Sequence, residues 1–186
     1  NMFGFRSNRS TQDAISSLLD RVKTLKASGK TVAVLSVDAS AAFDLLSHEL
    51  VLGSLKILGF GPRMIAWVQS FFQDCPQHVR IGASKSSSWT MDVGVGQGRK
   101  PSPDLFNTQC LWSFISEYFG YADDGMDVIA ADSIAECNKK IQQVADLRAA
   151  WFDAAGLPIN TAKTELMGIG FTPVPISINA AQICPS

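Results

Sequence analysis

The chain has 186 residues, of which 46% are apolar and 18% are charged. This composition suits one domain with a packed core and excludes a largely disordered chain. Sixteen Lys and Arg residues against seventeen Asp and Glu residues give a net charge of −1. That charge argues against a protein that binds nucleic acid by electrostatics alone. It does not exclude nucleic-acid chemistry, because acidic metal ligands can offset basic contacts.

The cysteines and the apolar runs indicate an intracellular protein. No two cysteines have the CxxC spacing typical of zinc or redox sites, so we expect reduced thiols. No apolar run is long enough for a transmembrane helix, and the start of the chain lacks the pattern of a signal peptide. Since position 1 is not Met, we interpret the chain as an internal fragment. The cysteines are Cys75, Cys110, Cys137 and Cys184.

The first expected elements are a helix and a buried strand. Ser10 followed by Asp13 is typical of a capping box, and apolar residues at helical spacing predict a helix that ends at Gly29. Residues 31–37 form a continuous apolar run rich in β-branched side chains, as expected for a strand buried on both faces. This strand ends at Asp38.

Helices and a hairpin are expected in the middle of the chain. Ser47 and Pro62 are typical of helix starts, and two β-prone runs around a short turn indicate a hairpin. A glycine-rich stretch then leads to another helix. The elements are helices over 47–58 and 62–72, strands over 77–81 and 88–93, and a fourth helix over 103–115.

The last part of the chain predicts a second hairpin, a long helix and two short strands. Asp123, Asp124 and Gly125 form a turn between apolar runs, while Ser133 precedes a helical pattern that Gly156 ends. Helices mixed with hairpins, rather than regular alternation of strand and helix, predict the α+β fold class. The elements are strands within 118–131, a helix over 133–155, and strands over 166–169 and 175–178.

Three carboxylates stand at the ends of apolar strands. Asp38 follows the first strand, and Asp123 and Asp124 lie at the turn between two later ones. Buried strands rarely end in acids unless a cation is present. If these strands are neighbours in one sheet, the carboxylates form an oxygen site suited to two Mg²⁺ or Mn²⁺ ions, about 3.5–4 Å apart, for phosphoryl transfer. Alternatively, the Asp-Asp-Gly segment is only a hairpin turn.

Five segments follow one another in a recognisable order and cover nearly the whole chain. They are FGFRSNRST at 3–11, VDASAAFD at 37–44, GQGRKPSPDLFN at 96–107, YADD at 121–124, and GLPIN at 156–160 with KTE at 163–165. Together they resemble the sequence boxes of reverse transcriptases from non-LTR (LINE-type) retrotransposons and their group II intron relatives. The resemblance implies an RNA-directed DNA polymerase that adds dNTPs to a primer 3′-OH by two-metal phosphoryl transfer.

The resemblance implies catalytic roles for several residues. Asp38, Asp123 and Asp124 match the family's metal-binding carboxylates, and Lys163 matches the lysine that supports departure of pyrophosphate. Phe43, five positions after Asp38, matches the bulky residue under the incoming sugar. Its ring would collide with a ribose 2′-OH, the group that separates RNA precursors from DNA precursors. Ordinary core packing is the alternative for Phe43, and solvated surface is the alternative for Lys163.

Other matched positions imply contacts with nucleotide and nucleic acid. Gln97 and Gly98 match residues that approach the nucleotide, since glycine permits close backbone approach and glutamine offers both a donor and an acceptor. Tyr121 would place its ring near the primer end. Arg6 and Arg9 are expected to contact phosphates, or else are ordinary loop charges. The implied partners are an RNA template, a DNA primer and dNTPs, with no membrane.

The implied architecture is a polymerase palm, an antiparallel sheet backed by helices, with a small part of the fingers. Residues 1–30 would form the entry helix between fingers and palm, and 31–186 would form the palm, with 60–95 as an insertion on the finger side. The N-terminal fingers and the thumb of the parent polyprotein are expected to lie outside this chain.

The boxes depart from the family pattern at a few positions. Gly96 replaces a proline, and the three positions after the Gln-Gly pair are not the usual small apolar residues. Asp104 stands where an apolar residue is common. Gly125 follows the two aspartates where a β-branched or polar residue is usual.

Two alternatives to the reverse transcriptase hypothesis remain at this stage. One is a related palm polymerase that makes RNA, against which Phe43 argues. The other is a catalytically inactive palm, or a degenerate copy, that only binds nucleic acid or a partner. The three intact carboxylates favour chemistry in the parent protein.

Overall fold

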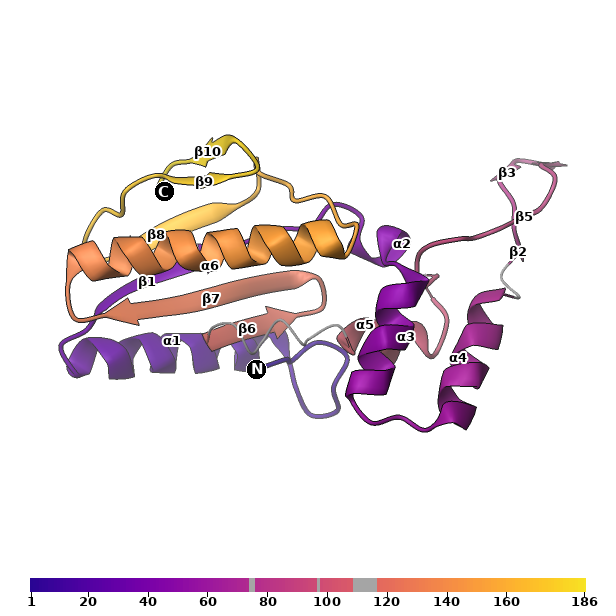
Figure 1. Ribbon diagram of the computed structural model, residues 1–186, viewed down its shortest axis with the longest axis horizontal. Coiled ribbons are helices and arrows are strands. Elements are labelled where there is room, and N and C mark those ends of the chain that lie inside the picture. The colour runs from indigo at the N-terminus through magenta and orange to yellow at the C-terminus, as the bar shows by residue number, and fades with distance from the viewer. Residues whose placement is uncertain (74–75, 97, 109–116) are drawn as a thin grey trace. The chain divides into compact units, whose positions relative to one another are not determined.

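The computed structural model describes residues 1–73, 76–96, 98–108 and 117–186 (Figure 1). The chain divides into two units, one formed by Asn1–Ala41 with Cys110–Ser186 and the other by Ala42–Gln109. The first unit is therefore discontinuous in sequence, and the second is inserted into it. Among the described residues, no helix combines the length and apolar character needed to cross a lipid bilayer.

An antiparallel sheet forms the centre of the first unit. Its strands are β1 (Thr31–Ser36), β6 (Glu117–Tyr121), β7 (Asp124–Ala131) and β8 (Glu165–Ile169), in the spatial order β6-β7-β1-β8. β1 lies between two partners, as its continuous apolar sequence predicts, and Val32, Ala33 and Leu35 are fully buried. The expected hairpin and the strand at 166–169 are confirmed.

Helix α1 (Thr11–Ala27) covers one face of this sheet. A complete capping box begins the helix: the Ser10 hydroxyl accepts from the Asp13 N–H at 3.2 Å, and the Asp13 carboxylate accepts from the Ser10 N–H at 2.8 Å. Its apolar side packs against side chains of three strands. The buried cluster consists of Phe3, Val22, Leu25, Val32, Phe119 and Val128.

Helix α6 (Ile134–Ala154) covers the opposite face. Ser133 caps it by accepting from the Glu136 N–H at 3.2 Å. Val128 faces α1, whereas the adjacent Asp127 contacts Arg148 of α6, and neighbouring strand residues point to opposite sides. The sheet is therefore enclosed between α1 and α6, and Figure 1 shows α6 running along β7 and β1.

A short hairpin ends the first unit. The strand expected at 175–178 is confirmed as β9 (Ile176–Ile178), but its partner is β10 (Ala181–Ile183), which the sequence analysis did not predict. Asn179 and Ala180 form the turn, both with positive φ, at 48° and 64°. The turn residues are Asn-Ala rather than the Asn-Gly pair that indicates such a turn, and alanine rarely adopts positive φ. The residue types therefore did not predict this hairpin.

The second unit contains short helices and very short strands. The helices expected at 47–58 and 62–72 are confirmed, and α2 is an addition that the sequence analysis did not predict. The fourth expected helix is shorter in the described residues, and its continuation over 109–116 lies outside them. The helices are α2 (Ala42–Leu45), α3 (His48–Ile57), α4 (Pro62–Gln73) and α5 (Ser102–Asn107).

The hairpin expected over 77–93 is interrupted. The Ser86 hydroxyl accepts the Val79 N–H at 2.9 Å, which replaces a regular rung of the ladder. Two separate two-residue ladders result instead of one continuous pair. They join β2 (Pro76–Gln77) to β5 (Trp89–Thr90) and β3 (Arg80–Ile81) to β4 (Ser84–Lys85).

Two of the four cysteines belong to the described residues. Cys137 is a buried free thiol and Cys184 is an exposed one. Burial raises the pKa of the Cys137 thiol, which disfavours the reactive thiolate. Cys75 and Cys110 lie outside the described residues.

Candidate active site

The aspartate pair stands at the tip of the β6–β7 hairpin. Tyr121 and Asp124 are the last cross-strand pair, and Ala122 and Asp123 form the turn between them. Ala122 has a φ of 55°, a left-handed conformation that alanine rarely adopts. Gly4 packs so closely on this turn that a Cβ atom at position 4 would overlap the Ala122 backbone nitrogen. The first sequence box therefore contacts the YADD box directly.

Asp38 follows β1, the strand next to the hairpin. β1 and β7 pair in antiparallel register, and the last pair joins Ser36 to Met126. The strand that precedes Asp38 and the hairpin that carries Asp123 and Asp124 are therefore neighbours in one antiparallel sheet. If the register continued two residues further, Asp38 would lie opposite Asp124.

The GLPIN box lies alongside Asp38. The Ser40 N–H donates to the Pro158 carbonyl at 3.0 Å, and the Asn160 N–H donates to the Asp38 carbonyl at 2.9 Å. Lys163 follows in a turn just before β8, and it is exposed. β8 pairs with β1 on the side opposite β7, and Ser36 lies across from Glu165. Lys163, two residues before Glu165, therefore lies on the β8 side of Asp38, opposite the hairpin.

The charges at this edge of the sheet influence one another. Partial burial, and then the charges of Asp123 and Asp38, raise the pKa of the Asp124 carboxyl above its ordinary value. The Lys163 ammonium opposes them and lowers the same pKa. Three carboxylates and one lysine from three separate boxes thus share one electrostatic environment.

The donor chemistry of this edge fits a divalent cation. Carboxylate oxygens are the ligands that Mg²⁺ and Mn²⁺ prefer, and a cation would relieve the repulsion of Asp124 by Asp123 and Asp38. In the part of the chain that the structure describes, no three His, Cys, Asp or Glu side chains form a ready-made metal ligand set. A cation bound here would therefore draw the carboxylates closer together.

An apolar groove runs beside Asp124. It has a volume of about 250 Å³ and lies between α1 and the β6–β7 hairpin. Asp124 and Tyr121 line it, as expected for a cross-strand pair, whose two side chains lie on the same face of the sheet. The other lining residues are Thr11, Ala14, Ile15, Leu18, Phe119, Gly125 and Met126.

The residues expected to approach the nucleotide belong to the second unit. Phe43 is half-buried and stacks on Phe106, with ring centroids 4.1 Å apart and planes 9° apart. The Val95 N–H also donates to the Phe43 carbonyl at 2.8 Å. Gly98 is exposed with a φ of 79°, and Gln97 lies outside the described residues.

Phe106, which the sequence analysis did not single out, is the stacking partner of Phe43. It belongs to the GQGRKPSPDLFN box, and its ring supports that of Phe43 across many residues of sequence. The Ser102 hydroxyl of the same box donates to the Val95 carbonyl. Its presence in a matched box was the one signal that could have drawn attention to Phe106. Sequence spacing does not show that it contacts the Phe43 ring.

The two arginines of the first box lie in the loop before α1. Both are exposed. The Arg9 guanidinium carbon lies 5.1 Å from the Phe3 ring centroid, so the side chain is held against the body of the first unit. Arg6 accepts a backbone hydrogen bond from the Arg9 N–H at 3.3 Å. These contacts do not connect either arginine to the carboxylate edge.

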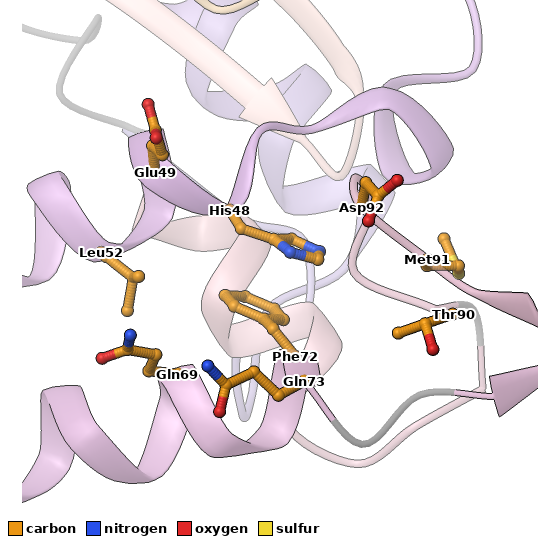
Figure 2. Close-up of a pocket in the computed structure, with 9 residues that line it drawn as sticks. All are labelled: His48, Glu49, Leu52, Gln69, Phe72, Gln73, Thr90, Met91 and Asp92. Atoms are coloured by element: carbon orange, nitrogen blue, oxygen red, sulfur yellow. The ribbon is translucent and has the colours of Figure 1, made fainter.

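A separate pocket of about 320 Å³ lies within the second unit (Figure 2). His48 stacks on Phe72 at its floor, with centroids 4.0 Å apart, and the His48 Nε2 atom lies 2.8 Å from the Gly94 carbonyl oxygen. Helices α3 and α4 and the segment around Asp92 supply the rest of the lining. None of the residues singled out in the sequence lines this pocket, so the candidate site stays at the carboxylate edge.

Comparison with known families identifies the class of protein. Residues 1–176 match the sequence profile of the family described as reverse transcriptase (RNA-dependent DNA polymerase). Because the match covers almost the entire chain, the chain belongs to the reverse transcriptase family.

Similar proteins come from transposons and other mobile elements. The Transposon TX1 uncharacterized 149 kDa protein of Xenopus laevis is 23% identical over 184 residues, which cover 88% of this chain and 14% of that protein. The RNA-directed DNA polymerase from mobile element jockey of Drosophila melanogaster is 25% identical over 172 residues, or 87% of this chain and 19% of that protein. The chain thus spans less than a fifth of the length of these relatives.

Solved structures share the fold. A telomerase from Candida albicans, in complex with a fragment of telomeric RNA, has a TM-score of 0.66 at 14% identity, covering 95% of this chain and 33% of that one. Apo telomerase from Candida tropicalis has a TM-score of 0.65 at 15% identity, covering 94% and 38%. The mixed helical and antiparallel architecture is therefore the polymerase palm fold that the sequence predicted.

Proposed function

We propose that this chain is the catalytic palm segment of a retrotransposon RNA-directed DNA polymerase. The observation that carries the proposal is the antiparallel pairing of β1, which ends two residues before Asp38, with β7, which begins at Asp124 in the hairpin that also carries Asp123. Family membership and the retrotransposon relatives support the same activity.

The three carboxylates would hold two divalent cations, Mg²⁺ or Mn²⁺. Such ions stabilise the charge that develops on the phosphate oxygens and lower the pKa of an attacking hydroxyl. Asp38 would contribute from the end of β1, and Asp123 and Asp124 from the hairpin turn. The reaction forms a bond between the primer 3′-oxygen and the α-phosphorus of a dNTP, breaks the bond from that phosphorus to the leaving pyrophosphate, and releases the 3′-hydroxyl proton.

Other residues would place the substrates. Lys163, beside the carboxylates, would neutralise charge on the leaving pyrophosphate. Phe43, supported by Phe106, would wall the sugar pocket and reject a ribose 2′-OH, with Gln97 and Gly98 against the nucleotide. Tyr121, which lines the groove beside Asp124, would contact the primer end.

The proposed partners are an RNA template, a DNA primer and dNTPs. Arg6 and Arg9 are exposed basic side chains that would contact backbone phosphates. A net charge of −1 leaves much of the polyanion contact to segments of the parent protein beyond this chain. Residues 1–30 are proposed as the entry between fingers and palm, and 31–186 as palm with a finger-side insertion at 60–95. The proposed setting is inside the cell, in the cytoplasm or the nucleus.

Primer extension on an RNA template tests this function in the protein that contains this chain. Asp124→Asn should reduce extension by about 10³-fold or more, because it removes a metal-binding charge without changing shape. Asp132→Asn is the matched control, since Asp132 follows the other end of β7 and forms only a surface ion pair with Lys30.

Two results would contradict the proposal. One is extension by Asp124→Asn at the rate of the unmodified protein. The other is a protein that binds RNA and primer but extends neither with Mg²⁺ nor with Mn²⁺, which would favour an inactive, binding-only palm.

A further inference from the structure

One aromatic ring covers the back of the hairpin that carries Asp123 and Asp124. Tyr118 in β6 is only 2% exposed, and its ring lies against the cross-strand pair Gly120 and Gly125. A Cβ atom at Gly125 would overlap the Tyr118 ring and hydroxyl, well inside the 3.0 Å that real Cβ atoms keep. A Cβ atom at Gly120 would collide with the Met2 sulfur and with the same ring. The ring therefore reaches this position only because both opposed residues are glycine.

A buried ion pair also contacts the ring. The Arg148 guanidinium carbon lies 4.8 Å from the Tyr118 ring centroid. Arg148 Nε donates to Asp127 Oδ2 at 2.8 Å and Arg148 Nη2 donates to Oδ1 at 2.5 Å, and each residue is 1% exposed. Asp127 is also the cross-strand partner of Tyr118. This two-pronged pair fixes direction as well as distance.

The Tyr118 ring and the proposed metal ligand Asp124 lie on opposite faces of one short segment, the end of the β6–β7 hairpin. Gly125 directly follows Asp124, and Gly120 directly precedes Tyr121, the cross-strand partner of Asp124. Asp124 points to the α1 side and lines the groove there, while Tyr118 and Arg148 occupy the α6 side. Any shift of the ring would move the two glycines and, with them, the Asp124 carboxylate.

We propose that Tyr118, seated on Gly120 and Gly125 and clamped by the Arg148–Asp127 pair, sets the position of the Asp124 carboxylate. Tyr118 and Arg148 are then positioning residues that act through the hairpin. The inference rests on the proposed function, in which Asp124 holds a metal ion. It deepens that function by naming what supports the ligand from behind.

Two considerations favour a positioning role over plain stability. A buried ion pair is often no more stabilising than apolar side chains of the same volume, so stability alone does not account for the Arg148–Asp127 pair. Metal ligands must also be held within about 0.5 Å of their working position. The clamp accounts for Gly125 as well, since a β-branched or polar side chain at that position would occupy the space of the ring.

The test compares Gly125→Ala and Arg148→Lys with the unmodified protein that contains this chain. Each variant should raise the Mn²⁺ dissociation constant, measured by calorimetry, and the Mg²⁺ concentration for half-maximal primer extension by about tenfold or more, as expected when the support of a metal ligand is lost. The KM for dNTP should change much less, and a cooperative thermal melt should persist. Gly53→Ala is the matched control, because nothing lies within 4 Å of a Cβ atom there.

A double variant separates positioning from general damage. In a Tyr118→Ala background the ring is absent, so adding Gly125→Ala should change the Mn²⁺ dissociation constant less than twofold. Should Gly125→Ala fail to fold, Arg148→Lys and Tyr118→Ala decide the question by the same metal readouts.

The outcomes distinguish the inference from the proposed function. If Asp124→Asn abolishes Mn²⁺ binding and extension but the Gly125, Tyr118 and Arg148 variants keep unmodified values of both, the inference is overturned and the function stands. If Asp124→Asn leaves Mn²⁺ binding unchanged, the proposed function and the inference are overturned together.

Discussion

Phe43 is the residue on which sugar selection is expected to depend. Its ring stacks on Phe106, and the residue is half-buried, so part of it remains accessible. In the protein that contains this chain, Phe43→Ala should raise ribonucleotide incorporation relative to deoxyribonucleotide by about tenfold or more, because rejection by shape is a difference of affinities. Steady-state incorporation with each nucleotide measures the ratio.

Phe43→Tyr is the control for this experiment, because it keeps the ring. The dNTP rate itself should change less than the ratio, since the carboxylates are untouched. An unchanged ratio in Phe43→Ala would reduce Phe43 to a packing partner of Phe106.

The Asp124 carboxyl makes stability depend on pH in a definite direction. Burial and the charges of Asp123 and Asp38 raise its pKa above the ordinary 3.8, so the folded state favours the protonated form. The resulting stabilisation is complete below pH 3.8 and is lost as the pH rises through the raised pKa.

Without metal, Asp124→Asn should therefore melt about 1–2 °C above the unmodified chain at pH 7, a small effect because the residue is exposed and screened. The difference should shrink as the pH falls toward 3.8. Melting curves between pH 7 and pH 4 measure it. An advantage that grows toward low pH would contradict the direction of the shift.

At the scale of elements, helix α6 depends on the residue that caps its N-terminus. The Ser133 hydroxyl accepts the Glu136 N–H, which otherwise lacks a partner within the helix. Ser133→Ala should lower the free energy of unfolding by about 1 kcal/mol, and Ser133→Asp should retain it. Denaturant unfolding monitored by circular dichroism checks this, and equal midpoints for Ala and Asp would show that the cap is unimportant.

Elements with a strong repeating pattern were predictable, and short ones were not. The helices α1 and α6 have recognisable starts at Ser10 and Ser133, and β1 is a continuous apolar run. By contrast, β10 follows a turn whose alanine adopts positive φ, and the expected hairpin over 77–93 is broken by the Ser86 hydroxyl. Both outcomes depend on local backbone bonding that residue type does not determine.

The candidate site was predictable to the extent that it lies within sequence boxes. The carboxylates at strand ends indicated one edge, and the pairing of β1 with β7 agrees. The clamp behind the hairpin was not predictable. Asp127 and Arg148 look like ordinary charges on a strand and a helix, and only the rotation of α6 against the sheet buries both together.

At the scale of the whole molecule, a divalent cation should stabilise the isolated chain more than it enables catalysis. Binding to the carboxylate edge raises the free energy of unfolding by mass action, and at ten times the dissociation constant the gain is about 1.4 kcal/mol, or about 3–5 °C. A thermal melt with and without Mn²⁺ measures this, and Asp124→Asn should abolish the shift.

The isolated chain should extend primers weakly or not at all. Positioning of substrates supplies a large share of catalysis, and a net charge of −1 holds a polyanion poorly against salt. Robust extension by these residues alone would contradict this expectation. A melt that is indifferent to metal in both the unmodified chain and Asp124→Asn would show that the carboxylates do not assemble.

The strand order β6-β7-β1-β8 also governs how the chain acquires its structure during translation. β1 emerges from the ribosome early, but its two neighbours are synthesised only after the whole inserted unit Ala42–Gln109. An apolar strand with both edges unpaired is a template for aggregation while it waits. A chain truncated within the inserted unit would therefore contain β1 without either neighbouring strand. We expect chaperones to bind that product.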